Sequence, residues 1–237
     1  MNPFADSEIF PVLPNRASLG NELRDSSVRA MTKWKTKPTD RFVLKWIKLN
    51  LSARITPRLA RFDWLRPGMI TTSAASLGVL AGVSFAFGWG WLAALIACAS
   101  QVLDGVDGQL ARLTGRVSRY GALLDAVLDR YADGSMVFGV FIYSVRLPSP
   151  LPIWLTVTLG GLGLIGSNLV SYSSAKAESL RVGIGNPTLA SKGTRMSVMI
   201  ICGLSSVVWP GAPLLALAYL AIHPNLAVAH RLVKGRT

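Results

Sequence analysis

Five acidic side chains are crowded into one short stretch of an otherwise apolar chain. Asp104 and Asp107 are spaced i and i+3, so they share one face of a helix. Asp125 and Asp129 are spaced i and i+4 and share a face of the next helix. A short connection makes these two helices antiparallel neighbours, so four carboxylates can converge on one point. The fifth residue, Asp133, lies one turn beyond Asp129, where we expect it to pair with Arg130 or another polar group, or to support the site from outside.

The chemistry of such a cluster is that of a hard metal ion. Ionisable groups in an apolar segment are costly and need a compensating partner. Carboxylate oxygens suit magnesium, manganese or calcium rather than zinc or copper. Two divalent cations would neutralise four carboxylates, which matches the two-metal arrangement for phosphate displacement. The spacing therefore predicts metal ligands at Asp104, Asp107, Asp125 and Asp129.

Small and basic residues accompany the aspartates at matching positions. Gly108 and Ala111 lie on or beside the aspartate face, and Gly121 lies one helical turn before Asp125. Small side chains there let a nucleotide or its diphosphate approach the backbone closely. Arg112 can direct its forked guanidinium onto phosphate oxygens. A polar packing cluster, or an ion pathway in a transporter, is the alternative interpretation of the same residues.

The elements that position these residues are predicted to be membrane helices. The 237 residues are 51% hydrophobic and 16% charged, and the mean hydropathy is +0.41, which is typical of a membrane protein. The net charge of +13 then indicates attraction to anionic lipid headgroups rather than to nucleic acid. Six apolar runs predict an all-α polytopic protein with six transmembrane helices, at about residues 69–89, 91–111, 121–145, 151–173, 194–208 and 212–222. The last two runs are short, so they either extend into their flanks or form a re-entrant pair.

The distribution of Lys and Arg predicts the orientation of these helices. Basic residues gather in alternate connections and at both ends, whereas the connections at 88–90 and 209–211 have none. By the positive-inside bias, both termini and the aspartate cluster face the cytoplasm from the cell (inner/cytoplasmic) membrane.

The region before the first apolar run is predicted to have two parts. Residues 1–38 are polar and form a loose cytoplasmic tail. Residues 39–64 form an amphipathic interfacial helix that Pro57 ends or kinks, and a solvated surface helix is the alternative. Its polar side holds Arg41, Lys45, Lys48 and Ser52. The membrane domain then covers residues 65–237.

At this point the sequence resembles a known family. The run DGVDGQLARLTGRVSRYGALLDAVLD, from Asp104 to Asp129, is similar to the signature of the CDP-alcohol phosphotransferases, and all eight fixed positions match across 26 residues. The family often opens its first span with Pro-Asn-x-x-Thr, whereas this chain has Gly68 at the Asn position and retains Thr71.

The resemblance implies the architecture and the residue roles. Members are six-span proteins, usually homodimers, with the active site at the cytoplasmic membrane surface. Asp104, Asp107 and Asp125 would hold two metal ions per active site, commonly magnesium, with manganese as the alternative. Asp129 would be the general base and a further metal ligand. The nucleotide site would comprise Thr71, Gly108, Ala111, Arg112 and Gly121.

The resemblance also implies the reaction. The donor is usually CDP-diacylglycerol, and an acceptor hydroxyl attacks its β-phosphorus and releases CMP, a step of phospholipid synthesis. Lys192, Arg195 and Arg116 could form an anion pocket beside the aspartates, so we expect a phosphorylated polyol such as inositol phosphate as acceptor. The alternative for these basic residues is that they only satisfy the positive-inside bias.

Two other functions fit parts of the pattern. The first keeps the chemistry but uses CDP-inositol as donor and makes a soluble inositol phosphodiester. The second is a divalent-cation transporter or a membrane scaffold. The acidic residues cluster at one side of two spans rather than near mid-membrane on several, which argues against a pore.

Overall fold

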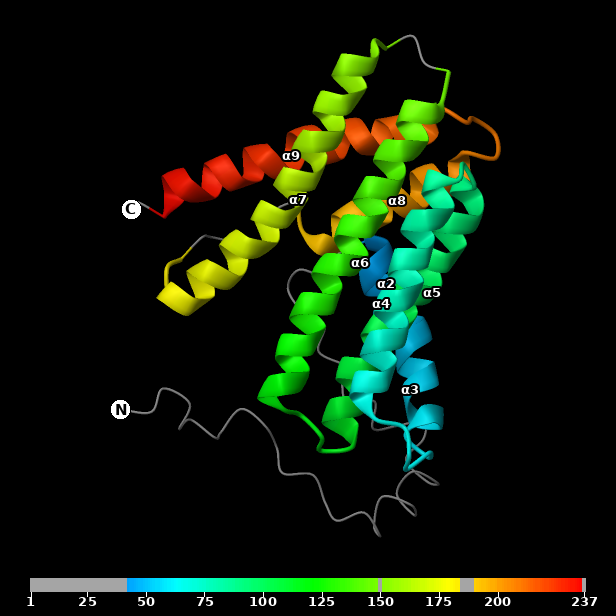
Figure 1. The fold of residues 1–237 in the computed structure, drawn as a ribbon. Helices are drawn as coiled ribbons and strands as arrows, with labels where there is room; N and C mark the ends of the chain where they lie inside the picture. The colour runs from blue at the N-terminus through cyan, green and yellow to red at the C-terminus, as the bar shows by residue number, and fades with distance from the viewer. Residues whose placement is uncertain (1–41, 149–150, 184–189, 236–237) are drawn as a thin grey trace.

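The computed structural model describes residues 42–148, 151–183 and 190–235, and its regular structure there is entirely helical (Figure 1). This confirms the all-α prediction, while the expected tail at residues 1–38 lies outside the described residues. In chain order the elements are α2 (Phe42–Ile47), the π-helical turn η2 (Lys48–Ser52), α3 (Ala53–Leu59), α4 (Pro67–Ala86), α5 (Gly90–Leu113), α6 (Arg119–Arg146), α7 (Ile153–Leu180), α8 (Lys192–Ser205) and α9 (Ala212–Lys234).

Helices α4, α5 and α6 run up, down and up (Figure 1), and α4 packs against both of the others. Helices α5 and α6 carry the aspartates. Pro67 starts α4, where its missing N–H costs nothing. Ser118 caps α6 by accepting a 3.0 Å hydrogen bond from the backbone N–H of Gly121. Helices α4 and α6 approach so closely that a Cβ on Gly139 would collide with the carbonyl of Gly82. The short turns and this close contact bring the aspartate faces of α5 and α6 together.

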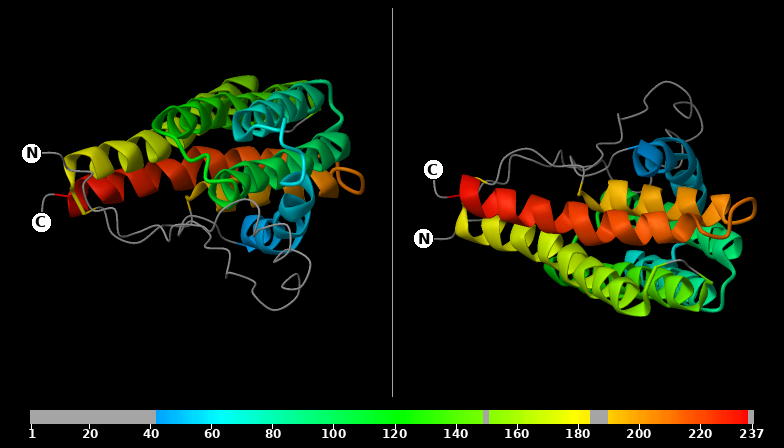
Figure 2. Two further views of the ribbon diagram at one scale, coloured as in Figure 1. Left: turned by 90° about the horizontal axis from the view of Figure 1, so that it is seen from below. Right: turned by 90° about the horizontal axis from the view of Figure 1, so that it is seen from above.

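The C-terminal helices form a second group. Figure 2 shows α7 and α9 side by side, and α8 packs against both α5 and α9. A buried core joins the two groups, with Phe85 of α4, Met136 of α6, Met199 of α8 and Leu217 of α9 among its members. Because α8 contacts α5, the first turn of α8 lies next to the aspartates.

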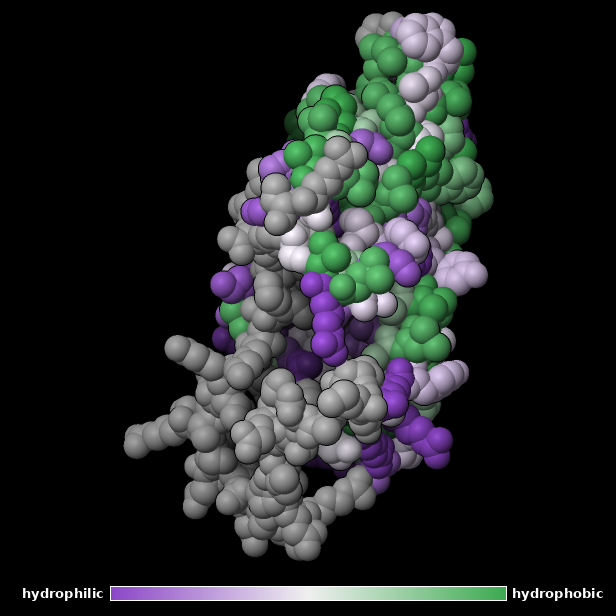
Figure 3. Space-filling model, turned by 90° about the vertical axis from the view of Figure 1, so that its left-hand side faces the viewer, coloured by the Kyte–Doolittle hydropathy of each residue, from purple (hydrophilic) through white to green (hydrophobic). Residues whose placement is uncertain are grey.

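Among the described residues, three helices are both long and apolar enough to cross a membrane: α4, α7 and α9. Helices α5 and α6 are long, with 24 and 28 residues, but they carry the aspartates. Helix α8 has 14 residues, fewer than the roughly 20 that a bilayer core needs. On the face in Figure 3, hydrophobic residues cover the upper part, whereas hydrophilic residues gather lower down.

The segment before α4 packs against α5. Ser52 and Thr56 are fully buried there, whereas Trp46 is 58% exposed. Ile47, from the apolar side, is also buried, and Lys45, from the polar side, is exposed, so the buried face combines residues of both sides. Pro57 lies inside α3, which ends two residues later at Leu59, close to the predicted break.

Candidate active site

Three aspartates form one compact group. Asp104 on α5 and Asp125 and Asp129 on α6 each offer a carboxylate oxygen, and these atoms lie within 4.8 Å of one another. All three residues are partly buried. The predicted convergence of the two helix faces is therefore seen for these three. Asp107, the fourth residue of the prediction, lies one turn further along α5 and is buried beside the group.

Two lysines hold this group together. The Nζ atom of Lys192, at the first residue of α8, lies 3.0 Å from Asp104 Oδ1 and 2.7 Å from Asp129 Oδ1. The Nζ atom of Lys48, in η2, lies 3.1 Å from Asp104 Oδ2. Lys192 was predicted to bind the acceptor, and the structure puts it directly on the carboxylates. Lys48 was predicted only as part of the polar side of the amphipathic helix.

The unused oxygens next to the group fit a hard cation. Asp107 Oδ2 and Gln101 Oε1 are buried and accept no hydrogen bond from the described residues. Both residues line a small cavity together with Asp104, Asp129 and Lys192. A buried oxygen without a donor is costly, and a divalent ion with oxygen ligands would remove that cost. The residues present therefore fit a divalent metal, and the orphaned Gln101 adds a candidate that the spacing of the aspartates did not indicate.

A large cleft opens beside the carboxylates. It has a volume of about 980 Å³ and lies between the N-terminal end of α4, the C-terminal end of α5 and the start of α6. All five residues of the predicted nucleotide site line it: Thr71, Gly108, Ala111, Arg112 and Gly121. Asp107 and Asp125 line it too, so the cleft is continuous with the aspartate group.

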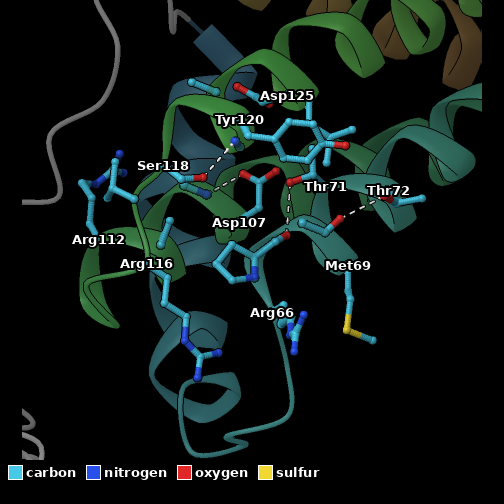
Figure 4. Close-up of a pocket in the computed structure, with 18 residues that line it drawn as sticks. Arg66, Met69, Thr71, Thr72, Asp107, Arg112, Arg116, Ser118, Tyr120 and Asp125 are labelled. Atoms are coloured by element: carbon cyan, nitrogen blue, oxygen red, sulfur yellow. Dashed lines mark hydrogen bonds between the residues drawn. The ribbon is translucent and has the colours of Figure 1, made fainter.

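The cleft is lined by basic side chains and by glycines that leave space beside their backbone (Figure 4). Figure 4 shows the carboxylate of Asp107 at its centre and Arg112 and Arg116 toward its margin. A Cβ on Gly108 would meet only the side chain of Arg112, at 3.6 Å, so its backbone is accessible. A Cβ on Gly68 would meet only Leu124, also at 3.6 Å, so the family's Asn would find room there.

The remaining predicted residues differ in their surroundings. Arg116 lines the cleft and donates to the carbonyls of Asp63 and Leu65, at 3.2 Å each. Arg195 is 0% exposed. Its guanidinium donates to Asp133 Oδ2 at 3.2 Å and to the carbonyl of Ala190 at 2.7 Å. Asp133 thus has a buried basic partner, but that partner is Arg195 rather than the Arg130 that we expected.

These features agree with the comparison to known proteins. The sequence model of the CDP-alcohol phosphatidyltransferase family matches residues 64–224. The chain therefore belongs to this family, as its signature predicts, and it is a transferase of substituted phosphate groups. Its family and its apolar helices together make it a membrane protein.

Individual relatives are named for inositol phosphate lipids. The chain is 35% identical over 153 residues to the archaetidylinositol phosphate synthase of Pyrococcus horikoshii, covering 65% of this chain and 77% of the relative. It is 31% identical over 199 residues to the phosphatidylinositol phosphate synthase of Cutibacterium acnes, covering 78% and 88%. The phosphatidylinositol phosphate synthase of Mycobacterium tuberculosis, solved with CDP-DAG bound, has the same fold, with a TM-score of 0.69 at 23% identity over 79% of this chain and 94% of that chain. The same Mycobacterium tuberculosis protein has also been solved with manganese and citrate, again with a TM-score of 0.69 at 23% identity.

Proposed function

We propose that this protein transfers the phosphatidyl group of CDP-diacylglycerol to a hydroxyl of a phosphorylated polyol, with inositol phosphate as the acceptor. The observation that carries the proposal is the continuity of the aspartate group with a cleft large enough for a nucleotide. The names of the two relatives support the acceptor. The neighbour solved with CDP-DAG supports the lipid donor.

The aspartates hold the metal in this proposal. Asp104, Asp107, Asp125 and Asp129 bind two divalent ions, with magnesium as the physiological metal. The neighbour solved with manganese supports a divalent ion. A divalent cation bound there supplies charge neutralisation to the donor diphosphate and to the leaving oxygen.

The cleft binds the donor nucleotide. Gly108, Ala111 and Gly121 leave the backbone of α5 and α6 open to CDP, and Thr71 closes the α4 side. Arg112 forks onto the diphosphate oxygens. The acyl chains of the donor extend from this cleft into the bilayer, because the outer surfaces of the helices are apolar.

Asp129 acts as the general base. Its carboxylate accepts the proton of the acceptor hydroxyl while that oxygen bonds to the β-phosphorus. The bond from the β-phosphorus to the CMP oxygen breaks in line, and CMP leaves. Lys192, 2.7 Å from Asp129, and Arg116 attract the acceptor phosphate. Arg195 does not contact the acceptor in this proposal. Its hydrogen bond to the carbonyl of Ala190 fixes the start of α8, which carries Lys192.

We further propose six transmembrane segments, α4 to α9, within a membrane domain at residues 65–237, in which the short α8 crosses together with the turns beside it. Residues 39–64 lie at the membrane interface, and residues 1–38 form a cytoplasmic tail. Both termini and the active site face the cytoplasm, because three basic residues lie in or next to the connection between α5 and α6: Arg112, Arg116 and Arg119. The protein functions as a homodimer in the cell membrane, by analogy with its family.

Release of CMP from CDP-diacylglycerol tests the reaction. Purified protein is supplied with magnesium and a panel of alcohols, including inositol phosphate, inositol and glycerol phosphate. Inositol phosphate is expected to give the fastest release, with the radiolabelled acceptor recovered in the lipid extract. Label that stays in the aqueous phase would refute the phospholipid product and favour a soluble inositol phosphodiester. Metal flux without any dependence on CDP-diacylglycerol would favour a transporter.

A further inference from the structure

The π-helical turn η2 reaches the aspartate group from a part of the chain that the family match does not cover. The match begins at residue 64, whereas η2 comprises Lys48–Ser52. No residue of this segment has a role in the reaction described above. A π-helical turn is rare and occurs frequently at functional sites, so its contacts are informative.

Polar bonds fix this segment to α5 at defined positions. Ser52 Oγ donates to the carbonyl of Val102 at 2.7 Å. Gln109 Nε2 donates to the carbonyl of Lys48 at 3.1 Å, and Gln109 Oε1 accepts from Thr56 Oγ1 at 2.8 Å. Ser52 and Thr56 are fully buried, so these bonds are shielded from solvent and specify one register of the segment on α5.

A glycine on α5 makes this register possible. A Cβ on Gly105 would lie 3.0 Å from Lys48 Cγ and still closer to the side chain of Ser52. Any larger residue would therefore push the segment away from α5. Gly105 immediately follows Asp104, so the point of closest approach lies directly beside a proposed metal ligand.

The docked segment directs Lys48 onto Asp104. The Lys48 ammonium lies 3.1 Å from Asp104 Oδ2, and the two side chains are only 12% and 10% exposed. The other oxygen, Oδ1, accepts from Lys192, which also donates to Asp129 Oδ1. Lys48 thus holds one carboxylate oxygen and turns the second toward the aspartate group.

We infer that Lys48 is a positioning residue of the active site, which makes the segment before the first membrane helix part of the catalytic unit. This inference rests on the proposed role of Asp104 as a metal ligand. A group that hydrogen-bonds a ligating carboxylate fixes its orientation, and its removal typically lowers metal affinity or activity about 10- to 100-fold. Lys48 does not touch substrate in this account and acts only through Asp104.

The test compares three variants of the full-length purified protein. Lys48→Met keeps the length of the side chain and removes the ammonium. Lys48→Arg restores a positive donor. Lys45→Met is the matched control, because Lys45 lies in α2, one turn before Lys48, and is exposed. For each variant, manganese binding is measured by electron paramagnetic resonance, and kcat and KM are measured by release of CMP.

Lys48→Met is expected to raise the dissociation constant for manganese at least about 10-fold and to lower kcat, with the donor KM changing less than about threefold. Lys48→Arg is expected to recover most of both losses, and Lys45→Met is expected to match the wild type. Manganese affinity and kcat in Lys48→Met equal to those of the wild type would refute the inference.

A further variant separates the ammonium from the docking of the segment. Ser52→Ala removes one bond to α5 but leaves Lys48 intact, so it is expected to bind manganese normally. An equal loss in Ser52→Ala and Lys48→Met would assign the effect to docking and overturn the role of Lys48. A wild-type protein that binds no manganese and releases no CMP would instead refute the proposed function.

Discussion

Two acidic sites lie one helical turn apart on α6 and have opposite surroundings. Asp129 belongs to a group of aspartates that lies beside a small cavity and connects to the large cleft. Asp133 forms a single ion pair with Arg195, and both residues are buried, at 5% and 0% exposure. Both residues are aspartates, but the first site borders open space, whereas the second is closed by its own ion pair.

The comparison shows that access and charge balance, rather than charge alone, separate a reactive site from a structural one. The pair of Asp133 and Arg195 carries one charge of each sign. In the first site four aspartates lie beside two lysines, Lys48 and Lys192, so the carboxylates outnumber these ammonium groups. This excess of negative charge favours the binding of a cation.

The largest expected effect is on turnover. Asp129→Asn removes the proposed base, so kcat is expected to fall about 10³-fold. Nucleotide binding and the melting temperature are expected to stay near those of the wild type, because Lys192 keeps its bond to Asp104. CMP release and a nucleotide-binding assay measure the two effects. Normal turnover in this variant would remove Asp129 from the role of base.

The neighbouring pair is expected to affect stability instead. Arg195→Leu leaves Asp133 as an unpaired buried charge, which is expected to lower the free energy of unfolding by about 3–5 kcal/mol. The double variant Asp133→Leu with Arg195→Leu removes both charges, so it is expected to recover most of that loss. Denaturant-induced unfolding in detergent measures the free energy of unfolding of the single and the double variant. A single variant as stable as the wild type would show that the buried pair contributes nothing.

Stabilisation by magnesium is expected to depend on the aspartate group and not on the pair of Asp133 and Arg195. A ligand present at 100 times its dissociation constant stabilises the protein by about 2.7 kcal/mol. Magnesium should therefore raise the melting temperature of the wild type and of the double variant at 133 and 195. The shift should shrink in Asp104→Asn. An equal shift in all three proteins would place the stabilising ion away from the aspartate group.

The smallest expected effect concerns donor binding in the cleft. Arg112→Lys keeps the charge but loses the fork, so the KM for CDP-diacylglycerol is expected to rise about 10-fold with little change in kcat. Steady-state kinetics of CMP release provide the measurement. A selective loss of kcat would instead assign Arg112 to the transition state.

The sequence predicts much of the site because its information is local. The intervals between Asp104 and Asp107 and between Asp125 and Asp129 set the shared faces, and the short connection brings the aspartate ends of α5 and α6 together. Both helices nevertheless pack mainly against α4 rather than against each other, which the sequence did not predict. The nucleotide residues belong to the same two helices, apart from Thr71. All of them line the cleft, as the resemblance to the family implies.

The partners from distant segments could not be predicted. Lys48 lies 56 positions before Asp104, and Arg195 lies 62 positions after Asp133. Periodicity reveals which residues share a face, but it does not reveal which face packs against a neighbour. The contacts of Ser52 and Thr56 with α5 are of the same kind, because they join residues 50 and 53 positions apart.

The end of the last helix shows a different limit. The final apolar run stops at residue 222 because His223, Pro224 and Asn225 interrupt it, yet α9 continues to Lys234. The amide of Asn225 donates to the carbonyls of Ala221 and Leu162, so a polar side chain joins α9 to α7. A hydropathy pattern alone treats Asn225 as the end of a helix, although its side chain stabilises the packing of α9 on α7.

The most direct test of the account is anomalous diffraction at the manganese edge from crystals of this protein grown with manganese. The account predicts a peak within about 2.5 Å of carboxylate oxygens from Asp104, Asp125 and Asp129. A map with no peak among these three side chains, from a protein that still releases CMP in a metal-dependent reaction, would contradict it.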